Sequence, residues 1–298
     1  MNILLTGASG LVGSALLPFL TEKGHKVAKL NRSSSDPAQP RWDTAAGTMD
    51  LTPAGPLDAV IHLAGENIAQ PWKRAVRNRI RESRIQSTKL LSQTLAESNT
   101  RPRVLICASA TGYYGDRGDE LLDEQSLPGH GFLPEICREW EAAADPARAA
   151  GIRVVHLRFG LILSTRGGAL KRMLPPFRLG IGGKLGDGHY FWSWIALDDV
   201  LGVVNFALEN TTLSGAVNTV SPFPITNREF TRTLARVLRR PAFFTVPPFL
   251  LEVLLGQMAH EALLCSFRVS PVKLVQAGFQ CKFTALEPTL QHLLRDLK

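Results

Sequence analysis

Cysteine is scarce in this sequence of 298 residues, and its four copies lie far apart with no Cys-x-x-Cys pair among them. No cluster of histidines lies near them either. A structural zinc site requires closely spaced ligand pairs, and a disulfide scaffold is typical of short secreted chains. We therefore expect no metal site, and four reduced, mainly structural thiols in a cytoplasmic protein.

Long hydrophobic runs are also missing. A membrane-spanning helix needs about 20 consecutive apolar residues, and the most apolar stretch, 243–256, is interrupted by Pro247, Pro248 and Glu252. Met1-Asn2 leads directly into a strand-like apolar run, so we expect neither a secretory leader nor a membrane partner. Hydrophobic residues make up 45% of the chain and charged residues 20%, which excludes a disordered protein.

The basic charge lacks the aromatic residues that nucleic-acid binding would use. The formal net charge is +8, and the segment 73–84 alone contains six basic residues and one acidic residue. No aromatic side chains alternate with these charges to stack on bases. We therefore expect no nucleic-acid partner, and interpret the segment as a local anion site or a solvated helix face.

Short apolar runs alternate with helical patterns in the first half of the chain, which is typical of a parallel α/β sheet. The runs are nearly continuous in hydrophobic residues, as expected for strands covered by helices on both faces. The predicted strands are 2–6, 26–30, 59–64, 104–108 and 153–157, and the predicted helices are 11–23, 73–98 and 135–150. We predict an α/β fold with a Rossmann-type doubly wound parallel sheet.

The texture changes after residue 160. The region 167–188 is rich in glycine and contains Pro175-Pro176, which favours a long, shaped loop. A helix at 200–209 and a strand at 216–220 follow, and helical patterns separated by proline-rich joints begin after Pro222. We interpret 1–165 as a Rossmann domain to which 195–220 returns, with 166–194 and 221–298 forming a small, mainly helical lobe.

A glycine-rich turn directly follows the first predicted strand and opens the first predicted helix. It reads Gly7-Ala8-Ser9-Gly10-Leu11-Val12-Gly13. Glycines let the backbone approach phosphates, while free amide N–H groups and the positive end of the helix dipole stabilise their negative charge. In this strand–turn–helix context, the turn predicts a dinucleotide site formed by Gly7, Ser9, Gly10, Leu11, Val12 and Gly13.

The Gly-x-x-Gly-x-x-Gly spacing resembles the short-chain dehydrogenase/reductase superfamily, specifically its extended, sugar-nucleotide-modifying branch. The segments 58–65, 108–115 and 83–88 support this resemblance. With Gly65-Glu66-Asn67-Ile68, 140–143 and 276–279, the whole chain resembles the atypical "epimerase family" group, which ends in a domain of unknown function. The resemblance implies that the loop Leu63, Ala64 and Gly65 passes the adenosine half of the cofactor, and that Arg84 stands where many members carry a cofactor-contacting asparagine.

The end of the second predicted strand indicates which nicotinamide cofactor is bound. An acidic residue there would bind the ribose 2′-hydroxyl and select NAD. Asn31 stands at this place instead, followed by Arg32 and Ser33. A guanidinium and a hydroxyl suit a 2′-phosphate, so we predict that Asn31, Arg32 and Ser33 select NADP(H).

The Tyr-x-x-x-Lys dyad of this superfamily is absent. The sequence has three tyrosines, and none is followed four residues later by lysine. In the resemblance, Glu141 anchors the alignment and puts Leu133 at the tyrosine position and Cys137 at the lysine position. Neither side chain can replace the dyad, which uses a lysine to lower the pKa of a proton-exchanging tyrosine.

Other residues are candidates for the missing chemistry. Ser109 lies at the carboxyl end of a predicted parallel strand, where α/β sheets bind ligands, and Tyr113 follows four residues later. We name Ser109 and Tyr113 as the catalytic candidates, although Tyr113 also fits a packing role. Weaker candidates are Glu66, Asn67, His189 and Tyr190, each of which also fits a structural or surface role. Lys73, Arg77, Arg81 and Arg84 form one helical stripe, of which Arg84 is our cofactor candidate.

These observations predict an NADP(H)-dependent oxidoreductase or epimerase acting on a small polar or nucleotide-linked substrate, with the second lobe on the substrate side. A redox sensor or scaffold that binds NADP(H) without chemistry is the alternative, because it explains the intact glycine turn and the missing dyad together. The sequence leaves the oligomeric state open between monomer and homodimer.

Overall fold

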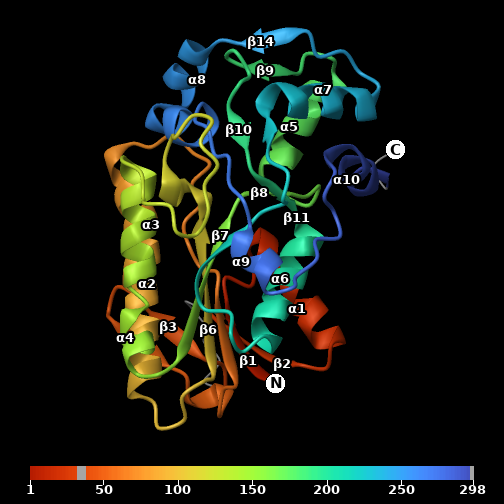
Figure 1. Ribbon diagram of the computed structural model, residues 1–298. Coiled ribbons are helices and arrows are strands. Elements are labelled where there is room, and N and C mark those ends of the chain that lie inside the picture. Colours follow the sequence, from red (N-terminus) through yellow and green to blue (C-terminus); the bar gives the residue numbers. More distant parts are fainter. Residues whose placement is uncertain (32–37, 296–298) are drawn as a thin grey trace.

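The computed structural model describes residues 1–31 and 38–295. Its centre is a six-stranded sheet with the order β12-β7-β6-β5-β1-β2, in which every neighbouring pair is parallel (Figure 1). The strands are β1 (Asn2–Thr6), β2 (Lys26–Leu30), β5 (Ala59–His62), β6 (Val104–Ala110), β7 (Arg153–Phe159) and β12 (Gly215–Thr219). The predicted Rossmann-type α/β fold is confirmed.

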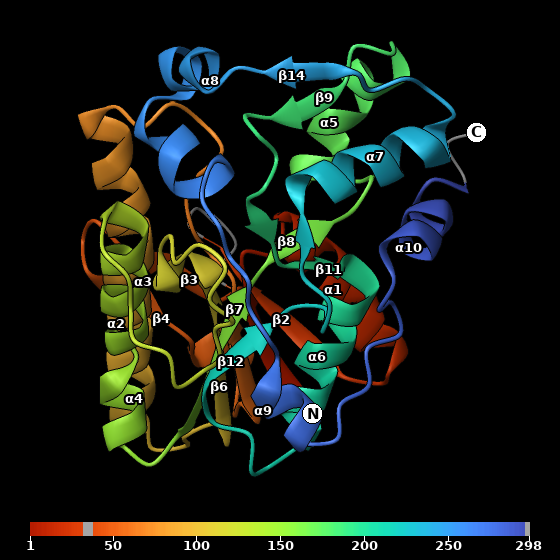
Figure 2. The ribbon, with the colours of Figure 1, turned by 45° about the horizontal axis from the view of Figure 1, so that its top comes forward.

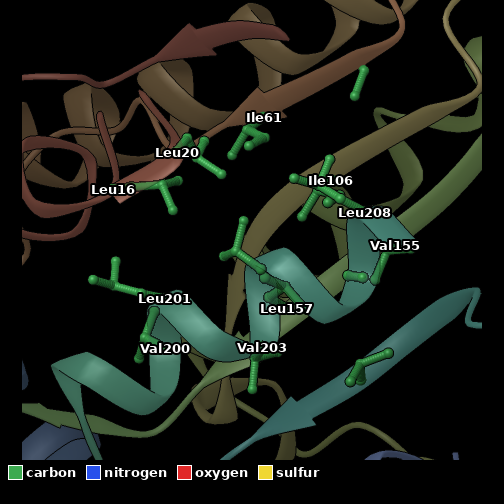
Figure 3. Close-up of a cluster of buried hydrophobic side chains, with 14 of the residues drawn as sticks. Leu16, Leu20, Ile61, Ile106, Val155, Leu157, Val200, Leu201, Val203 and Leu208 are labelled. Carbon is green, nitrogen blue, oxygen red and sulfur yellow. The ribbon is translucent and has the colours of Figure 1, made fainter. Parts of the chain in front are cut away.

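Helices cover both faces of this sheet. One face packs against α1 (Leu11–Glu22) and α6 (Leu197–Glu209), and the other against α2 (Arg74–Glu97) and α4 (Asp145–Ala149). Strand β1 shows the alternation: Ile3 and Leu5 belong to the first core, and Leu4 to the second. Figure 3 shows the first core, in which side chains from α1 and α6 meet those of the strands. Burial on both faces explains the continuous apolar runs.

The strand order reverses between β1 and β5, because β2 lies on one side of β1 while β5, β6, β7 and β12 follow on the other. In open parallel sheets, ligands bind outside the carboxyl ends of the strands at this point. The turns after Thr6 and His62 therefore lie side by side at the edge where a ligand is expected.

A second group of elements packs around a separate apolar core (Figure 2). This core contains Leu174, Trp194, Phe230 and Leu290. The elements of this region are α5 (Gly168–Arg178), β9 (Gly183–Leu185), β10 (Phe191–Trp192), β13 (Ile225–Thr226), α7 (Asn227–Leu238), β14 (Phe244–Val246) and α10 (Leu286–Leu293). Helix α8 (Pro248–Leu255) follows β14, but its Leu255 packs in another cluster, with Trp72 and Leu133. Strands β9 and β14 pair with each other, as do β10 and β13.

The remaining elements lie beside the main sheet or between it and the second lobe. They are β3 (Arg41–Asp43), β4 (Thr48–Asp50), η1 (Thr52–Ala54), η2 (Thr111–Tyr114), α3 (Phe132–Ala142), β8 (Leu161–Leu163), β11 (Trp194–Ala196), η3 (Ala259–Leu263) and α9 (Val272–Gln276). Strands β3 and β4 form a hairpin, and β8 pairs with β11. Helix α9 packs on β12, and Leu274 enters the core of the main sheet, so 221–298 is not confined to the second lobe.

Two predicted elements are wrong. The region 167–188 was expected to be a loop, but it contains α5 and β9; Leu170, Leu174 and Phe177 form the buried face of α5 despite the Pro175-Pro176 pair inside it. The predicted helix 135–150 is split into α3 and α4, and proline occupies the first turn of α4, where it suits a new helix start.

Candidate functional site

The backbone of the glycine turn packs so tightly against its surroundings that side chains at Gly7 and Gly13 would not fit. Gly7 has φ 68°, and a Cβ there would lie 2.7 Å from the backbone carbonyl of Leu63. A Cβ at Gly13 would lie 2.2 Å from the carbonyl oxygen of Gly7. Glycine therefore brings the turn after β1 against the loop after β5. Gly10 starts α1 without a side-chain cap or an acidic residue in the first turn, so the turn suits an anionic group such as a diphosphate.

A buried hydrogen-bond chain fixes the loop beside this turn. The hydroxyl of Thr6 accepts the amide N–H groups of Leu63 and Ala64 at 3.1 and 3.2 Å, and lies 2.7 Å from Nδ1 of His62. His62 Nε2 lies 2.9 Å from the hydroxyl of Thr88 on α2. Burial lowers the pKa of His62 to about 4, so the ring is neutral at physiological pH and links β1, β5 and α2. Sequence reasoning missed His62, which ends β5.

Arg84 lies against the same loop. Its guanidinium carbon would be 3.3 Å from a Cβ at Gly65 and is 5.0 Å from the centre of the Trp140 ring. The structure thus brings the predicted residues Gly7, Gly13, Leu63, Gly65 and Arg84 to one edge of the sheet. Asn31 follows β2, where its carbonyl oxygen accepts the amide of Trp42 at 3.3 Å. Arg32 and Ser33 lie outside the described residues.

Ser109 is part of a buried ion-pair network. Its hydroxyl donates to Oε1 of Glu141 at 2.7 Å, and Arg158 donates to both carboxylate oxygens of Glu141 at 2.8 Å. Burial acts to raise the pKa of Glu141, but the hydrogen bonds and charge of Arg158 lower it below its ordinary value. Ser109 is only 3% exposed. Its proton is engaged with a carboxylate, so the hydroxyl has its lone pairs to offer to a ligand.

The two tyrosines after β6 differ in their surroundings. Tyr114 is fully buried, its hydroxyl donates to Asn218 at 2.7 Å, and burial raises its pKa to about 12. Tyr113 is partly exposed, and its ring lies over the guanidinium of Arg158 at 3.5 Å. The Tyr113 hydroxyl forms no hydrogen bond with any residue that the structure describes. Of the two phenols, that of Tyr113 is therefore free to contact a ligand.

The positions of the missing dyad lie beside these tyrosines. Leu133 packs against η2, where a Cβ at Gly112 would lie 3.3 Å from its side chain. Cys137 follows one turn later on α3 and is buried. Burial, together with the charge of Glu141, raises the pKa of the Cys137 thiol to about 12. The thiol is neutral and provides neither a cation nor a reactive thiolate.

The weaker candidates are divided between two places. Glu66 accepts a hydrogen bond from Gln70 at 3.1 Å, and Asn67 forms a local turn with Ala69. His189 lies on the second lobe, where its exposed ring is 3.5 Å from Asp187. Two basic residues of the α2 stripe already have partners in other parts of the chain: Arg77 donates to Gln257 at 2.7 Å, and Arg81 pairs with Glu139.

Helix α5 adds residues to this edge that sequence reasoning missed. A Cβ at Gly167 or Gly168 would lie 3.2 Å from the side chain of Leu11, so α5 begins directly beside the first turn of α1. Arg172 of α5 donates to the carbonyl oxygen of Ala69 at 2.7 Å. The second lobe therefore contacts both loops of the candidate site. In the sequence, the adjacent Gly167-Gly168 pair could have indicated this close approach to α1.

Within the described parts of the chain, no group of three or more histidine, cysteine or acidic residues is placed to hold a metal ion. Among the same residues, no helix combines the length and the apolar character that crossing a membrane requires.

Comparison with known proteins agrees with this geometry. The model of the NAD-dependent epimerase/dehydratase family matches residues 3–220. The chain belongs to this family. A second model, for a domain of unknown function termed DUF1731, matches residues 246–293. The resemblance found in the sequence is confirmed.

Several relatives match almost the whole chain. The epimerase family protein Mb2239 of Mycobacterium bovis is 40% identical over 93% of this chain and 92% of its own length. The structure of human epimerase family protein SDR39U1 with NADPH is 31% identical, has a TM-score of 0.89, and covers 99% of this chain and 100% of its own. A nucleoside-diphosphate sugar epimerase from Corynebacterium glutamicum is 36% identical with a TM-score of 0.80, covering 98% of this chain and 57% of its own.

Proposed function

We propose that this chain binds NADP(H) and catalyses a hydride transfer of the oxidoreductase or epimerase type. One observation carries the proposal: the backbone of the glycine turn after β1 packs directly against the backbone of Leu63, and the turn leads into the uncapped N-terminus of α1. A Cβ at Gly7 or Gly13 would collide with backbone, and the first turn of α1 has no acidic residue to repel a phosphate. These features fit the diphosphate of a dinucleotide.

The choice of the phosphorylated cofactor rests on two supports. Asn31 supplies no carboxylate at the end of β2 to repel a 2′-phosphate. The human relative SDR39U1 was crystallised with NADPH. Arg32 and Ser33 remain our proposed partners of the 2′-phosphate.

We assign the proton transfer to Tyr113. A bound NADP(H) supplies the hydride donor or acceptor. Tyr113 holds a phenol with no hydrogen-bond partner among the described residues, next to Ser109 at the end of β6, and gives its proton to the substrate oxygen during reduction or takes one during oxidation. Ser109 orients the substrate by accepting a hydrogen bond through its lone pairs, since its own hydroxyl hydrogen is hydrogen-bonded to Glu141. Nucleotide-linked sugars are the favoured substrate class, because the relative from C. glutamicum is described as a nucleoside-diphosphate sugar epimerase.

Calorimetric titration with NADP⁺, NADPH, NAD⁺ and NADH tests the cofactor assignment. We expect the phosphorylated pair to bind more tightly, and the preference to be lost in Arg32→Ala. Equal binding of NAD⁺ and NADP⁺ would contradict the role of Arg32. If none of the four nucleotides binds, the proposed function is wrong.

The role of Tyr113 is tested by Tyr113→Phe in a screen of nucleotide-sugar and small carbonyl substrates with NADPH. We expect turnover to fall about 100-fold or more, as is typical for the loss of a general acid, while NADPH affinity stays the same. Tyr190→Phe is the comparison variant, because it removes the phenol of a weaker candidate on the second lobe. Unchanged turnover in Tyr113→Phe would contradict the assignment.

A non-catalytic redox sensor is the second candidate. It is favoured by the apolar Leu133 and the neutral Cys137 at the dyad positions, and by the engagement of the Ser109 proton. A sensor requires different affinities for NADP⁺ and NADPH. The titrations test this difference, and the substrate screen separates the two functions, because turnover with any substrate rejects the sensor.

A further inference from the structure

Arg84 is carried by α2, but its guanidinium lies between two elements of the candidate site. On one side it faces the backbone of Gly65, in the loop after β5. On the other side it lies over the ring of Trp140 on α3, with 5.0 Å between the guanidinium carbon and the ring centre. Cys137 stands one turn before Trp140 on the same helix, so Arg84 lies close to the place where the dyad lysine is missing.

Arg84 forms no ion pair with an acidic residue in the described parts of the chain. Its one hydrogen bond there is a donation from Nη1 to the backbone carbonyl of Ile80 at 3.1 Å. Glu66, the acidic side chain in that loop, lies 3.9 Å from Arg79, and its charge offsets part of the effect that burial has on the pKa of Arg84. Arg84 is partly buried, and burial lowers its pKa. A partly buried cation without an ion-pair partner is unfavourable unless a ligand supplies the missing acceptors.

The neighbouring arginines on α2 differ from Arg84 in this respect. Arg77 donates to Gln257, and Arg81 forms an ion pair with Glu139 of α3. Both are bound to elements other than the loop of Gly65. Arg84 is therefore the arginine of this stripe that is partly buried, lies against the loop after β5 and forms no ion pair with an acidic residue within the described structure.

We propose that Arg84 supplies, from α2, the positive charge that the missing lysine would supply from α3. It binds the nicotinamide half of the dinucleotide. This inference rests on the proposed binding of NADP(H). The neutral thiol of Cys137 is part of the arrangement, because a lysine at that position would place a second cation beside Arg84.

The test compares two ligands by calorimetry: NADP⁺, and adenosine 2′,5′-bisphosphate, which lacks the nicotinamide riboside. In Arg84→Ala, we expect the affinity for NADP⁺ to fall about 10- to 100-fold, the range for a lost charge-assisted hydrogen bond, while the affinity for the bisphosphate stays unchanged. Arg84→Lys should retain most of the NADP⁺ affinity. Arg81→Ala is the matched control, since it removes a guanidinium from α2 and a contact to α3 but should leave both affinities unchanged.

A sharper test moves the positive charge from position 84 on α2 to position 137 on α3. In the double variant Arg84→Ala with Cys137→Lys, we expect NADP⁺ affinity to recover at least 5-fold relative to Arg84→Ala. If the double variant does not fold, the comparison of Arg84→Lys with Arg84→Ala decides.

The outcomes separate the two proposals. An equal loss of affinity for both ligands in Arg84→Ala would overturn the assignment to the nicotinamide half, and no loss for either would overturn a cofactor role for Arg84. In both cases the binding of NADP⁺ by the unaltered protein keeps the proposed function intact. If the unaltered protein binds neither ligand, the proposed function fails, and this inference fails with it.

Discussion

At the scale of single residues, the chain uses its buried polar groups to fix the edge of the sheet where the site lies. Thr6 and His62 end adjacent strands, and their contact holds the loop after β5 in place. Ser109, Glu141 and Arg158 do the same between β6, α3 and β7. These partners are 32 or more residues apart in two of the three pairings, so no local sequence pattern could indicate that the Ser109 hydroxyl donates a hydrogen bond to Glu141.

The neutral state of His62 predicts how stability depends on pH. The ordinary histidine pKa of 6.5 applies to the unfolded chain, and burial lowers the value in the folded chain to about 4. Between these values the unfolded chain binds a proton that the folded chain does not, so His62 lowers the free energy of unfolding as the pH falls below 6.5. From pH 7.5 to 5, this contribution amounts to about 2 kcal/mol.

Urea denaturation of the unaltered protein and of His62→Gln at both pH values measures this contribution. The variant should be less stable at pH 7.5, because it loses hydrogen bonds to Thr6 and Thr88, but it should lose about 2 kcal/mol less on acidification. His156, whose pKa burial also lowers to about 4, provides a second case that should behave in the same way. Equal pH dependence in the unaltered protein and His62→Gln would show that His62 is not held neutral in the folded chain.

At the scale of elements, the first half of the fold could be predicted from local patterns, and the second lobe could not. The predicted strands 2–6 and 26–30 coincide with β1 and β2, and the glycine turn lies where its sequence context indicated. Sequence reasoning missed α5 because its glycines and prolines favour a loop. Its apolar face is buried only by packing against residues of α7 and α10, which are distant in the sequence. Local pattern does not report such distant partners.

Helix α3 illustrates this dependence on distant residues. Gly131 begins it without a side chain to cap the free amides, and Glu261 of η3 accepts them instead, from Phe132 at 3.2 Å and from Leu133 at 2.8 Å. The C-terminal region thereby caps the helix that carries Leu133 and Cys137. A carboxylate at a helix N-terminus is also favoured by the helix dipole.

Removal of this cap should destabilise the protein measurably. For Glu261→Ala we expect the free energy of unfolding to fall by about 1 to 2 kcal/mol, as for other lost N-caps. Glu135→Ala is the control, since Glu135 is an exposed acid in the first turn of α3 and should cost less than about 1 kcal/mol. Equal losses in urea denaturation of the two variants would mean that the effect of Glu261 comes from charge near the helix end and not from the cap.

At the scale of the whole molecule, the C-terminal region returns to the Rossmann sheet after building the second lobe. Helix α9 packs on β12, and Phe279 contacts α6 through Phe206 and Gly202. The sequence alone suggested a separate lobe for 221–298, because helical pattern does not reveal the surface against which a helix packs. The return matters for the site, since β12 also carries Asn218, which accepts the hydroxyl of Tyr114.

Asp199 on α6 fastens this returning segment. It is 4% exposed, and its two carboxylate oxygens accept the amide N–H groups of Lys282 at 2.8 Å and Phe283 at 2.9 Å. In Asp199→Ala both amides lose a charged acceptor, so we expect the free energy of unfolding to fall by about 2 to 4 kcal/mol in urea denaturation. The neighbouring Asp198→Ala is the matched control: its side chain is about half exposed, and its one ion pair within the described residues is with His292, so the loss should stay within about 0.5 kcal/mol. Because the segment packs on the sheet beside α6, its release should also raise the rate of proteolysis after residue 276 in Asp199→Ala and not in Asp198→Ala. Equal stability and equal proteolysis in the two variants would show that apolar packing alone holds the C-terminal region on the sheet.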